Sequence, residues 1–449
     1  MKRLFGTDGI RAVAGESPLD PANVRCFGAA LADVLGSDRK GPPRVVLGRD
    51  TRESGAWLGA AVSAGLFSRG AESVDAGVIT TPGLAHLART GPFEAGVMIS
   101  ASHNPFEDNG LKVFGHDGTK LPDLLEAEIE ARILDHGIPD PGPSERCAVV
   151  DPSLARAYVE FLEGAVSPRG RLAGVKVLLD CANGSASVFA PEVFRHHGAE
   201  VLVRGAAPDG RNINLGCGSL HLDGLASEVR DRRCDVGIAF DGDADRALAV
   251  DRMGRVVDGD LILYLLARRM RRSERLRGGA VVATVMSNLW LERRLEQEGM
   301  RLLRAPVGDK YVLERMIAED ARLGGEQSGH VIVLDLASTG DGILTGLLLL
   351  DTLIEEDAPL EAILDGIAPF PQVLVNVGVR EKPDLERHPV IGPAVREIER
   401  RLQGSGRILL RYSGTEPLAR VMVEGRDADS VRGHAERLAG LIRKEIGST

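Results

Sequence analysis

The sequence predicts an α/β protein with three related α/β domains, each built on a mixed sheet, followed by a smaller α+β domain. Three observations support this prediction. Apolar β-type runs alternate with helix-like stretches, a succession of three such runs occurs three times, and the C-terminal part follows a different pattern. A chain of 449 residues also exceeds what one typical core accommodates, so we expect several domains.

The three repeats have the same order of elements. The first contains the runs RVVLGRD, VDAGVITTP and AGVMISASHNP, the second VKVLLDCANG, AEVLVRG and DVGIAFDGDADR, and the third GAVVATVMSN, RLLRAPVGD and RLGGEQSGH. Helix-like segments such as GAWLGAAVSAGLFSRG lie between the runs, which is typical of α/β layers. In each repeat the third run ends in a polar loop, and α/β sheets bind their ligands at such strand ends.

Clusters of proline and glycine predict the domain boundaries. The segment IPDPGPSERC (138–147) separates the first repeat from the second, and APFPQ (368–372) separates the third from the C-terminal part, which contains the runs VLVNVGV, RILLRYSG and ARVMVEG and a closing helix. The second and third repeats join near DRMGRVVDGD. We therefore predict α/β domains at 1–150, 151–254 and 255–368 and an α+β domain at 369–449.

Composition excludes several classes of protein. The net charge of -10 and the lack of a dense Lys/Arg tract argue against a nucleic-acid partner, although a few converging basic groups could still bind a small anion. The sequence shows neither a secretion signal nor an apolar run long enough for a membrane span, so we expect a cytoplasmic protein without a membrane partner. The longest apolar run, from Gly342, predicts a buried helix, and the five scattered cysteines suit reduced structural thiols.

The segment DGDADR follows the run DVGIAF and brings three carboxylates together, Asp241, Asp243 and Asp245. Carboxylates this close repel one another unless a cation neutralises them, and an all-oxygen set suits Mg²⁺ or Ca²⁺ better than Zn²⁺. An EF-hand is excluded, because Arg246 and Arg252 stand where its glycine and glutamate are required. The segment predicts a metal site, and a solvated acidic turn is the alternative.

Ser102 and His103 follow the run AGVMI, and Asn104 precedes Pro105, so the chain turns sharply and presents Ser102 to solvent or to a ligand. A serine hydrolase is one interpretation, but the G-x-S-x-G segment of a nucleophile elbow is missing and sequence neighbours rarely face each other. A serine that accepts and returns a phosphoryl group is the interpretation that the metal segment supports. A turn or helix-capping serine is the third.

Two further loops carry polar groups. In GGEQSGH, Glu326 and Ser328 are able to pair with hydroxyls, and His330 could carry protons. The loop RYSGTEPLAR combines guanidinium groups, hydroxyls and a flexible backbone, which suit a phosphate, in Arg411, Ser413, Gly414, Thr415 and Arg420. Each loop alone could be an ordinary turn, but four loops that suit phosphate, metal or hydroxyls favour a common ligand.

Four basic residues are weaker candidates. Arg11 in FGTDGIR and both Arg49 and Arg52 in LGRDTRESG could line a site or form surface ion pairs. Lys112 could lie near Ser102 if the segment NGLKVF returns as a strand, and it could equally be a solvated strand residue.

In this order and at these separations, SASHNP, DGDADR, GEQSGH and RYSGTEP resemble the motifs of the α-D-phosphohexomutase superfamily, and the likeness spans the whole chain. The resemblance implies four domains around a central cleft. Within the superfamily, FGTDGIR, TVMSN, VGDKYV and SGTEPLARVMVEG look like the branch of bacterial phosphoglucosamine mutases. Phosphomannomutase/phosphoglucomutases are similar and remain the alternative.

The resemblance implies a role for each motif. The serine that matches Ser102 is phosphorylated, and its phosphate joins the aspartates that match Asp241, Asp243 and Asp245 in holding Mg²⁺. The remaining implied roles are a basic neighbour of this phosphate at Arg246, a supporting neighbour at His103, proton carriers at Lys112 and His330, sugar hydroxyl binding at Glu326 and Ser328, and binding of the non-reacting phosphate at Arg411, Ser413, Gly414, Thr415 and Arg420.

The implied reaction interconverts glucosamine 6-phosphate and α-glucosamine 1-phosphate through a glucosamine 1,6-bisphosphate intermediate that also activates the enzyme, on the route to UDP-N-acetylglucosamine. The partner is a small phosphosugar, and a homodimer stays an open alternative. Two other functions remain, a phosphosugar-binding protein without turnover and a metal-dependent phosphatase. Residue types do not distinguish an amine from a hydroxyl on the sugar.

Overall fold

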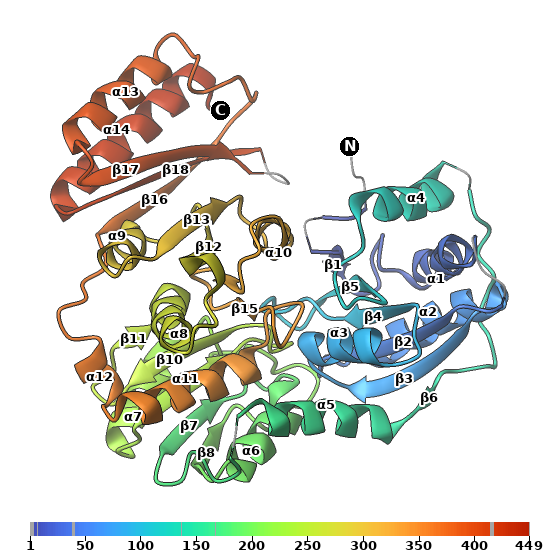
Figure 1. Ribbon diagram of the computed structural model, residues 1–449. Helices are drawn as coiled ribbons and strands as arrows, with labels where there is room; N and C mark the ends of the chain where they lie inside the picture. Colours follow the sequence, from blue (N-terminus) through green and yellow to red (C-terminus); the bar gives the residue numbers. More distant parts are fainter. Residues whose placement is uncertain are drawn as a thin grey trace. The chain divides into compact units, whose positions relative to one another are not determined.

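The computed structural model describes residues 4–6, 8–37, 41–135, 137–166, 168–413 and 417–448. The chain divides into two compact units, one formed by Met1–Thr284 with Ala305–Asp365 and the other by Val285–Arg304 with Gly366–Thr449. The domain boundaries predicted from proline and glycine clusters stay a prediction, since this division does not test them. Figure 1 shows the course of the chain and labels the helices and strands.

The first sheet of the first unit is mixed and has the order β1-β5-β4-β2-β3-β6. Its strands β2, β3, β4 and β6 run parallel, and β5 and β1 run antiparallel to their neighbours. Four helices accompany it. The elements are β1 (Ile10–Val13), α1 (Pro21–Gly36), β2 (Arg44–Arg49), α2 (Gly55–Ser68), β3 (Glu72–Val78), α3 (Thr81–Thr90), β4 (Ala95–Ile99), β5 (Asp108–Gly115), α4 (Asp123–Leu134) and β6 (Val149–Val150).

Two glycines allow α1 and α2 to pack closely. A Cβ atom on Gly28 would lie 2.3 Å from the Val62 carbonyl oxygen, and one on Gly65 would lie 2.1 Å from the Arg25 carbonyl oxygen. The missing side chains therefore let the two backbones touch, which presses both helices onto the apolar core of the first sheet.

The second sheet has the order β11-β10-β9-β7-β8, with β8, β7 and β9 parallel and β10 and β11 antiparallel. The elements are α5 (Pro152–Ala165), β7 (Lys176–Asp180), α6 (Ala186–His196), β8 (Glu200–Arg204), α7 (Leu222–Asp231), β9 (Val236–Phe240), β10 (Ala247–Asp251) and β11 (Val256–Val257). The fully buried strand β9 leads directly into the acidic loop, so the core of this sheet positions the three carboxylates.

The third part of the first unit pairs β12 in parallel with β14, and β14 antiparallel with β15. Its elements are α8 (Gly259–Arg272), the short 3-10 helix η1 (Arg277–Gly279), β12 (Ala280–Thr284), α10 (Asp309–Ala318), β14 (Leu323–Gly325), β15 (Val331–Val333), α11 (Gly342–Glu356) and α12 (Leu360–Ile363). The helix predicted from Gly342 is confirmed as α11, whose residues are buried over most of its length. Three mixed sheets with helices confirm the predicted α/β class.

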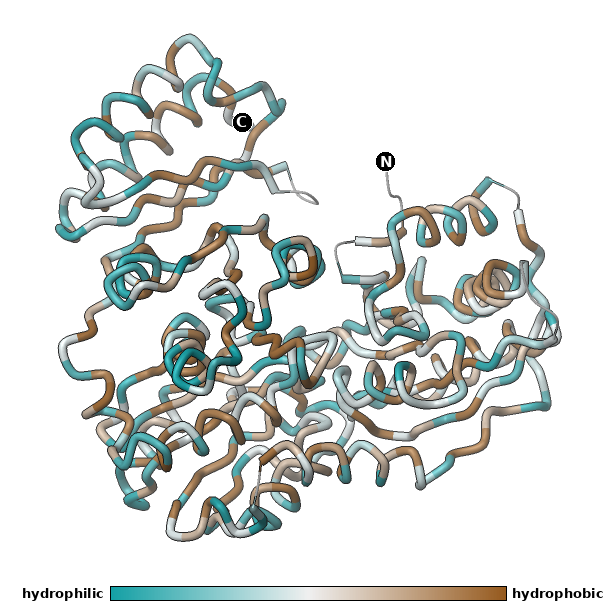
Figure 2. The backbone as a smooth tube through the Cα atoms, viewed as in Figure 1, coloured by the Kyte–Doolittle hydropathy of each residue, from teal (hydrophilic) through white to brown (hydrophobic). Residues whose placement is uncertain are grey.

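The second unit contains an antiparallel sheet of order β16-β18-β17. Its elements are α9 (Leu289–Gln297), β13 (Arg301–Ala305), which ends at the unit boundary, β16 (Gln372–Gly378), α13 (Ile391–Leu402), β17 (Gly406–Tyr412), β18 (Leu418–Gly425) and α14 (Ala428–Ile446). The apolar faces of α13 and α14 pack with this sheet into one core. Figure 2 shows the corresponding alternation of hydrophobic and hydrophilic positions along both helices.

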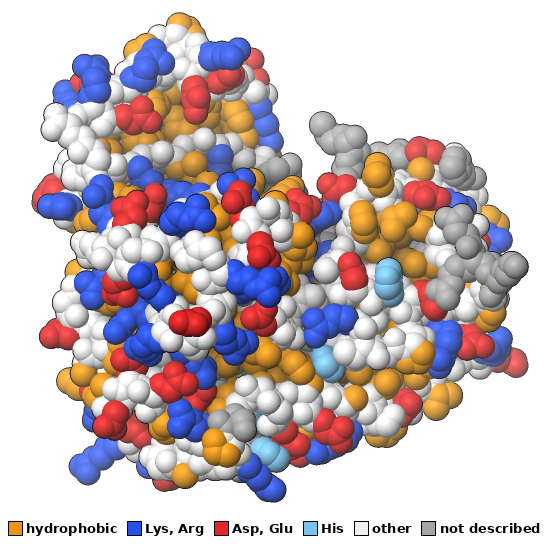
Figure 3. Space-filling view, in the orientation of Figure 1, with side chains coloured by type: hydrophobic (Ala, Val, Ile, Leu, Met, Phe, Trp, Pro, Cys, Tyr) orange, Lys and Arg blue, Asp and Glu red, His pale blue; other side chains and the backbone are white. Residues whose placement is uncertain are grey.

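The charged surface residues and the cysteines are arranged as the sequence predicts. Basic and acidic side chains are interspersed over the face seen in Figure 3. All five cysteines are free, and four of them are buried, as predicted for structural thiols. In the parts of the chain that the structure describes, we find no helix whose length and apolarity would suit a bilayer crossing.

A buried hydrogen bond joins the second sheet's helix α5 to α11. The Tyr158 hydroxyl donates to Asp341 Oδ2 at 2.9 Å, and Asp341 Oδ1 caps α11 by accepting from the Leu344 amide at 3.0 Å. Burial raises the pKa of Asp341 from its ordinary 3.8 to about 6, against the lowering effect of these hydrogen bonds. The folded chain therefore binds more protons than the unfolded chain between these values, and it loses stability as the pH rises through them.

We predict that Asp341→Asn removes this part of the pH dependence, because an amide fills the same space but does not titrate. The measurement is the free energy of unfolding in urea between about pH 4 and pH 7. The exposed Asp223→Asn on α7 is the matched control and should keep the wild-type profile. An Asp341→Asn profile parallel to wild type would contradict the prediction.

Candidate active site

The polar loops of the first unit meet because they follow strand ends. The serine loop leaves β4, the acidic loop leaves β9, and the loop of Glu326 and His330 joins β14 to β15. Contacts between these loops, given below, show that the structure brings the first three predicted motifs together. The fourth motif lies on the sheet of the second unit.

Ser102 is buried, with 1% of its surface exposed, and it has a left-handed backbone with φ of 53°. Its hydroxyl donates to Asp241 Oδ2 at 2.5 Å and lies 3.3 Å from His103 Nδ1. The expected sharp turn is present, but the side chain points to the acidic loop and not to solvent, because Asp241 accepts its hydrogen bond. The serine is thus held against a carboxylate of the predicted metal site.

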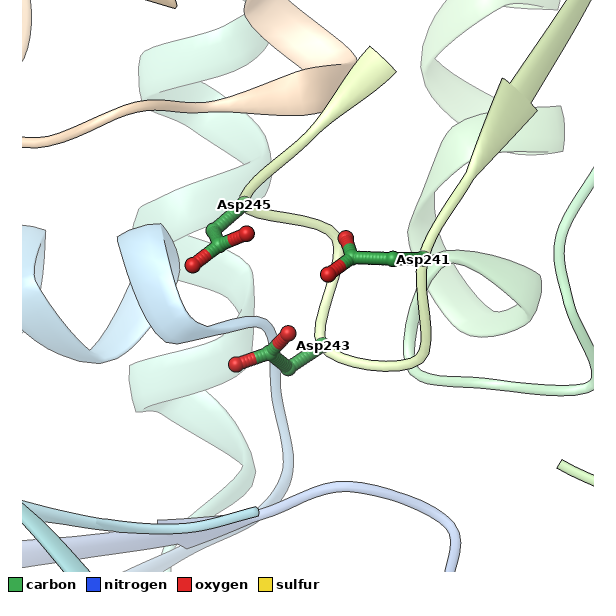
Figure 4. A group of neighbouring side chains, drawn as sticks. All are labelled: Asp241, Asp243 and Asp245. Carbon is green, nitrogen blue, oxygen red and sulfur yellow. The ribbon is translucent and has the colours of Figure 1, made fainter. Parts of the chain in front are cut away.

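The three aspartates form the acidic group that the sequence predicts. Their candidate ligand oxygens all lie within 4.8 Å of one another, and all three residues are buried. Figure 4 shows Asp241 pointing across the loop towards Asp243 and Asp245. The Oδ1 atoms of Asp243 and Asp245 are buried and make no hydrogen bond, so each has an oxygen left for a further ligand.

The charges of this group fit a hard cation. Burial, together with the charges of Asp245 and Asp243, raises the pKa of Asp241 well above its ordinary value. Such mutual repulsion in a buried place is what a bound divalent cation relieves, and an oxygen-only donor set is the kind that Mg²⁺ takes. The described residues therefore fit the magnesium site that the resemblance implies.

Cations and a helix end already surround part of the acidic loop. Lys112 Nζ lies 2.8 Å from Asp243 Oδ2 and 3.8 Å from Asp245 Oδ2, and Arg246 Nε lies 3.6 Å from Asp245 Oδ1. Thr81, the first residue of α3, donates its hydroxyl to Asp243 Oδ2 at 2.5 Å and its amide to the Asp243 carbonyl oxygen at 2.9 Å. The positive end of α3 thus faces the loop.

Lys112 lies on β5, which returns as a strand antiparallel to β4, the strand that leads to Ser102. Its ammonium group is buried, and it also lies 3.1 Å from Asp8 Oδ2. Burial lowers the pKa of Lys112, but the charges of Asp243, Asp8 and Asp245 outweigh this and raise it above the ordinary value. Lys112 is therefore a buried cation.

His330 is buried between the acidic loop and α10. Its Nε2 accepts a hydrogen bond from the Gly340 amide at 3.0 Å, and its Nδ1 lies 3.6 Å from Asp245 Oδ2. Burial lowers the pKa of His330, but the hydrogen bond and charge of Asp245 outweigh this and raise it. Because Gly340 donates to Nε2, the proton on the ring faces Asp245.

His103 has the opposite electrostatic setting. Burial and the charges of Arg246 and Arg11 lower the pKa of His103 to about 4. Its imidazole is therefore neutral at neutral pH, beside the Ser102 hydroxyl.

Glu326 and Ser328 lie together at the β14–β15 turn. The Ser328 hydroxyl donates to Glu326 Oε2 at 3.3 Å, and the Gly308 amide donates to Glu326 Oε1 at 3.1 Å. Both side chains are half-buried, so they remain accessible to a hydroxylated ligand. The contact with Gly308 brings the N-terminus of α10 to this loop.

Arg11 and Arg49 have different surroundings. Arg11 Nη1 donates to the Ala101 carbonyl oxygen at 3.2 Å, and Arg11 also pairs with Asp8, so it lies against the serine loop. Arg49 Nη1 lies 2.6 Å from Asp75 Oδ2 on the neighbouring strand β3. Among the described contacts, Arg49 forms this structural ion pair and touches no candidate site residue.

The basic loop of the second unit places two like charges opposite each other. Arg411 on β17 and Arg420 on β18 are direct partners in the antiparallel register. Burial and the charge of Arg420 lower the pKa of Arg411. Two guanidinium groups in this position suit an anion such as phosphate. Ser413 is buried and its carbonyl accepts from Lys382 at 2.8 Å, whereas Gly414 and Thr415 lie outside the described residues.

Sequence reasoning missed several residues of the site. Asp8 and Lys120 join Lys112 in a chain of alternating charges that reaches Asp309 on α10, with Lys120 Nζ 2.5 Å from Asp8 and 2.6 Å from Asp309. Thr81 contacts the acidic loop and Asn214 the serine loop without any sequence motif that marks them, and Arg52, whose sequence surroundings are equally compatible with a surface ion pair, contacts the serine loop. Each of these residues contacts a residue from a distant part of the sequence, so no local sequence motif identifies it.

Comparison with known proteins gives a consistent result. Models described as phosphoglucomutase/phosphomannomutase α/β/α domains I, II and III match residues 2–137, 156–254 and 258–370, and a model of the C-terminal domain matches residues 374–441. The phosphoglucosamine mutase of Solibacter usitatus is 49% identical over 446 residues, covering 99% of both chains.

Solved structures share the fold. A phosphoglucomutase/phosphomannomutase family protein from Burkholderia thailandensis aligns with a TM-score of 0.79 at 22% identity over 100% of both chains. The N-acetylphosphoglucosamine mutase of Aspergillus fumigatus, solved in complex with GlcNAc-6P and magnesium, aligns with a TM-score of 0.65 at 18% identity over 98% of this chain and 96% of that one. At these identities the likeness concerns the fold alone.

The acidic loop should bind a divalent cation through its carboxylates. We predict that Asp243→Asn and Asp245→Asn each weaken Mg²⁺ binding by at least about tenfold, because each removes an anionic oxygen ligand. Isothermal titration of the purified chain with Mg²⁺ measures this. Asp251→Asn on β10, whose carboxylate accepts from backbone amides, is the control and should bind as the wild type. Equal affinity in all four proteins would refute the assignment.

Gly242 should be required where the acidic loop crosses the serine loop. A Cβ atom there would lie 2.5 Å from the Ser102 carbonyl oxygen. We predict that Gly242→Ala destabilises the fold by about 1–3 kcal/mol, since a backbone atom has to move. Gly164→Ala on α5, where a Cβ meets nothing within 4 Å, should instead be stabilising by roughly 0.5–1 kcal/mol. Urea unfolding measures both, and equal midpoints would contradict the close contact.

Proposed function

The chain belongs to the phosphoglucosamine mutases of the α-D-phosphohexomutase superfamily, and we propose that Ser102 carries the phosphoryl group in their reaction. The reaction interconverts glucosamine 6-phosphate and α-glucosamine 1-phosphate, so the chain is an isomerase that moves a phosphoryl group within one sugar. The observation that carries the assignment to Ser102 is its hydroxyl, held 2.5 Å from Asp241 of the acidic group.

In the proposed cycle, phosphorylated Ser102 gives its phosphoryl group to the free hydroxyl of the sugar monophosphate. The bond between Ser102 Oγ and phosphorus breaks as a bond from the sugar oxygen forms, and the proton that the sugar hydroxyl loses ends on Ser102 Oγ, carried by Lys112 or His330. The resulting 1,6-bisphosphate turns over, and its other phosphoryl group returns to Ser102. The phosphate has then moved between C6 and C1, and the enzyme is regenerated.

Charge neutralisation is the main task of the residues around Ser102, because phosphoryl transfer depends on positioning and electrostatics more than on covalent help. We propose that Asp241, Asp243 and Asp245 hold Mg²⁺, which when bound supplies positive charge beside the transferring group. Arg246 and Lys112 provide fixed positive charge at the same place. His103 is a neutral neighbour of the serine.

Proton transfer requires a group near the sugar hydroxyl, and Lys112 and His330 are the proposed carriers. The buried ammonium of Lys112 is suited to donating a proton or stabilising charge. The Nε2 atom of His330 accepts from Gly340, so this histidine would have to give up that bond before it takes a second proton. The geometry therefore favours Lys112 as the cationic partner, with His330 orienting Asp245.

The substrate is proposed to be bound through its hydroxyls and its non-reacting phosphate. Glu326 and Ser328 are proposed for the hydroxyls. The pair Arg411 and Arg420, with Ser413, Gly414 and Thr415, is proposed for the phosphate, supported by the like charges that face each other across β17 and β18. The 1,6-bisphosphate as activator, the homodimer and the cytoplasmic location stay predictions.

The deciding experiment compares kcat/KM for glucosamine, glucose and mannose phosphates, with Mg²⁺ and a trace of glucose 1,6-bisphosphate. We expect glucosamine phosphate to be preferred, because the relatives at high identity carry that activity in their names. Ser102→Ala should abolish turnover, while Ser73→Ala on β3, whose hydroxyl bonds to Ser63, should keep it.

Each alternative predicts a different result. Preference for glucose or mannose phosphate would favour a phosphoglucomutase or phosphomannomutase. Release of inorganic phosphate in proportion to substrate would favour a phosphatase, and binding without turnover would favour a sensor protein. Full activity of Ser102→Ala would refute the role of this serine.

A further inference from the structure

Two side chains from different sheets bind the same two carbonyl oxygens of the serine loop. Arg52 Nη2 donates to the carbonyl oxygens of Ser102 and Asn104 at 2.9 Å each. Asn214 Nδ2 donates to the same two oxygens at 2.9 and 3.0 Å. Arg52 comes from the loop between β2 and α2, and Asn214 from the loop between β8 and α7. The serine loop is therefore fastened from both sheets at once.

Arg52 is a buried cation that is used entirely for this purpose. None of its side-chain surface is exposed, and its Nη1 atom donates to the Pro105 carbonyl oxygen. Its Nε lies 2.9 Å from Asp50 Oδ2, an oxygen that also accepts from the Ser100 hydroxyl at 2.7 Å. A guanidinium offers donors in a rigid planar fork, which allows one side chain to hold several acceptors in fixed directions.

The same network reaches the amide side of the serine. The Ser102 amide donates to the Ser100 hydroxyl oxygen at 2.9 Å. The Ser102 peptide groups are thus held on both sides, through Ser100 and Asp50 at the amide and through Arg52 and Asn214 at the carbonyl. Ser102 needs such restraint, because a left-handed conformation is unfavourable for a residue other than glycine unless its surroundings enforce it.

The position of Asn214 links this restraint to the acidic loop. Asn214 lies in a loop of the second sheet, whose strand β9 ends at Phe240 directly before Asp241, while Ser102 follows β4 of the first sheet. The loop of Gly242 passes directly under the Ser102 carbonyl oxygen and the Asn214 amide group. The bonds of Asn214 therefore fix the serine loop relative to the carboxylates as well as to its own sheet.

We propose that Arg52 and Asn214 are positioning residues that set the rate of phosphoryl transfer by fixing Ser102 Oγ against the acidic group. Neither side chain touches the reacting atoms, since both act through the backbone carbonyls of Ser102 and Asn104. The inference rests on the proposed transfer at Ser102. It adds that the alignment of Ser102 Oγ depends on these two donors, whereas the affinity for the sugar does not depend on them.

The test compares Arg52→Lys and Asn214→Gly with wild type. Lysine keeps the charge beside Asp50 but lacks the planar fork, and glycine keeps the positive φ of 61° at position 214 without the amide donor. Arg171→Lys, which alters an ion pair of 2.7 Å with Asp351, and Arg233→Gly, at an exposed residue with φ of 52°, are the matched controls.

The readouts are kcat and KM per folded chain, the melting temperature, and the rate at which Ser102 takes up phosphate from glucose 1,6-bisphosphate, followed by intact mass. We expect kcat and the uptake rate to fall by roughly tenfold to a hundredfold in both site variants, with KM within about threefold of wild type, because a displaced nucleophile loses alignment and not substrate affinity. The control variants should keep wild-type kcat even where their melting temperatures fall.

Three results would overturn the inference. They are unchanged kcat and uptake in the site variants, a loss that only follows the folded fraction, and a loss confined to KM. If Arg52→Lys does not fold, Asn214→Gly decides alone, because it leaves the buried cation in place. Wild-type protein that takes up no phosphate at Ser102 would overturn the proposed function together with this inference, whereas normal wild-type uptake with unaffected variants would overturn this inference alone.

Discussion

The burial of three carboxylates in one short loop is the constraint on which the rest of the site depends. Asp241, Asp243 and Asp245 are all buried, with candidate ligand oxygens within 4.8 Å of one another. Such a group is unstable unless positive charge or hydrogen-bond donors surround it. Lys112, Arg246 and the N-terminus of α3 meet this need in part. Two carboxylate oxygens without hydrogen bonds leave room for a cation.

The same constraint explains why Ser102 is buried. An exposed serine would be an ordinary hydroxyl, whereas Ser102 donates to Asp241 and shares its environment with the acidic group. In this placement the serine loop crosses the acidic loop so closely that position 242 has no room for a side chain, which a glycine allows. Ser102 also has a strained backbone conformation. Arg52 and Asn214 donate hydrogen bonds to its carbonyl oxygen, so they restrain this conformation.

The second unit obeys a related electrostatic logic. Arg411 and Arg420 face each other across two strands, an arrangement that costs stability in the absence of an anion. The buried carboxylates of the first unit favour binding of a cation, and the guanidinium groups of the second favour binding of an anion.

The amino-acid order is enough to predict the helices and strands and the chemical type of each loop. The periodicity of apolar residues and the positions of breaker residues predict strands such as β4 and β9 and the buried helix α11. The acidic spacing of DGDADR predicts a cation site. These properties depend on neighbouring residues alone. Even the placement of Lys112 beside β4, the strand that leads to Ser102, follows from a local return of the chain as β5.

Which side chains from distant segments meet depends on the packing of the folded chain. The inward orientation of Ser102, the buried cation of Arg52, the reach of Asn214 to another sheet and the charge chain through Asp8 and Lys120 all depend on how separate sheets pack. Arg49 and Arg52 stand three positions apart in one segment, yet one forms an ion pair with a neighbouring strand and the other holds the serine loop. Their sequence surroundings are alike, so the difference comes from the direction in which each side chain leaves the backbone and the partners that packing places there.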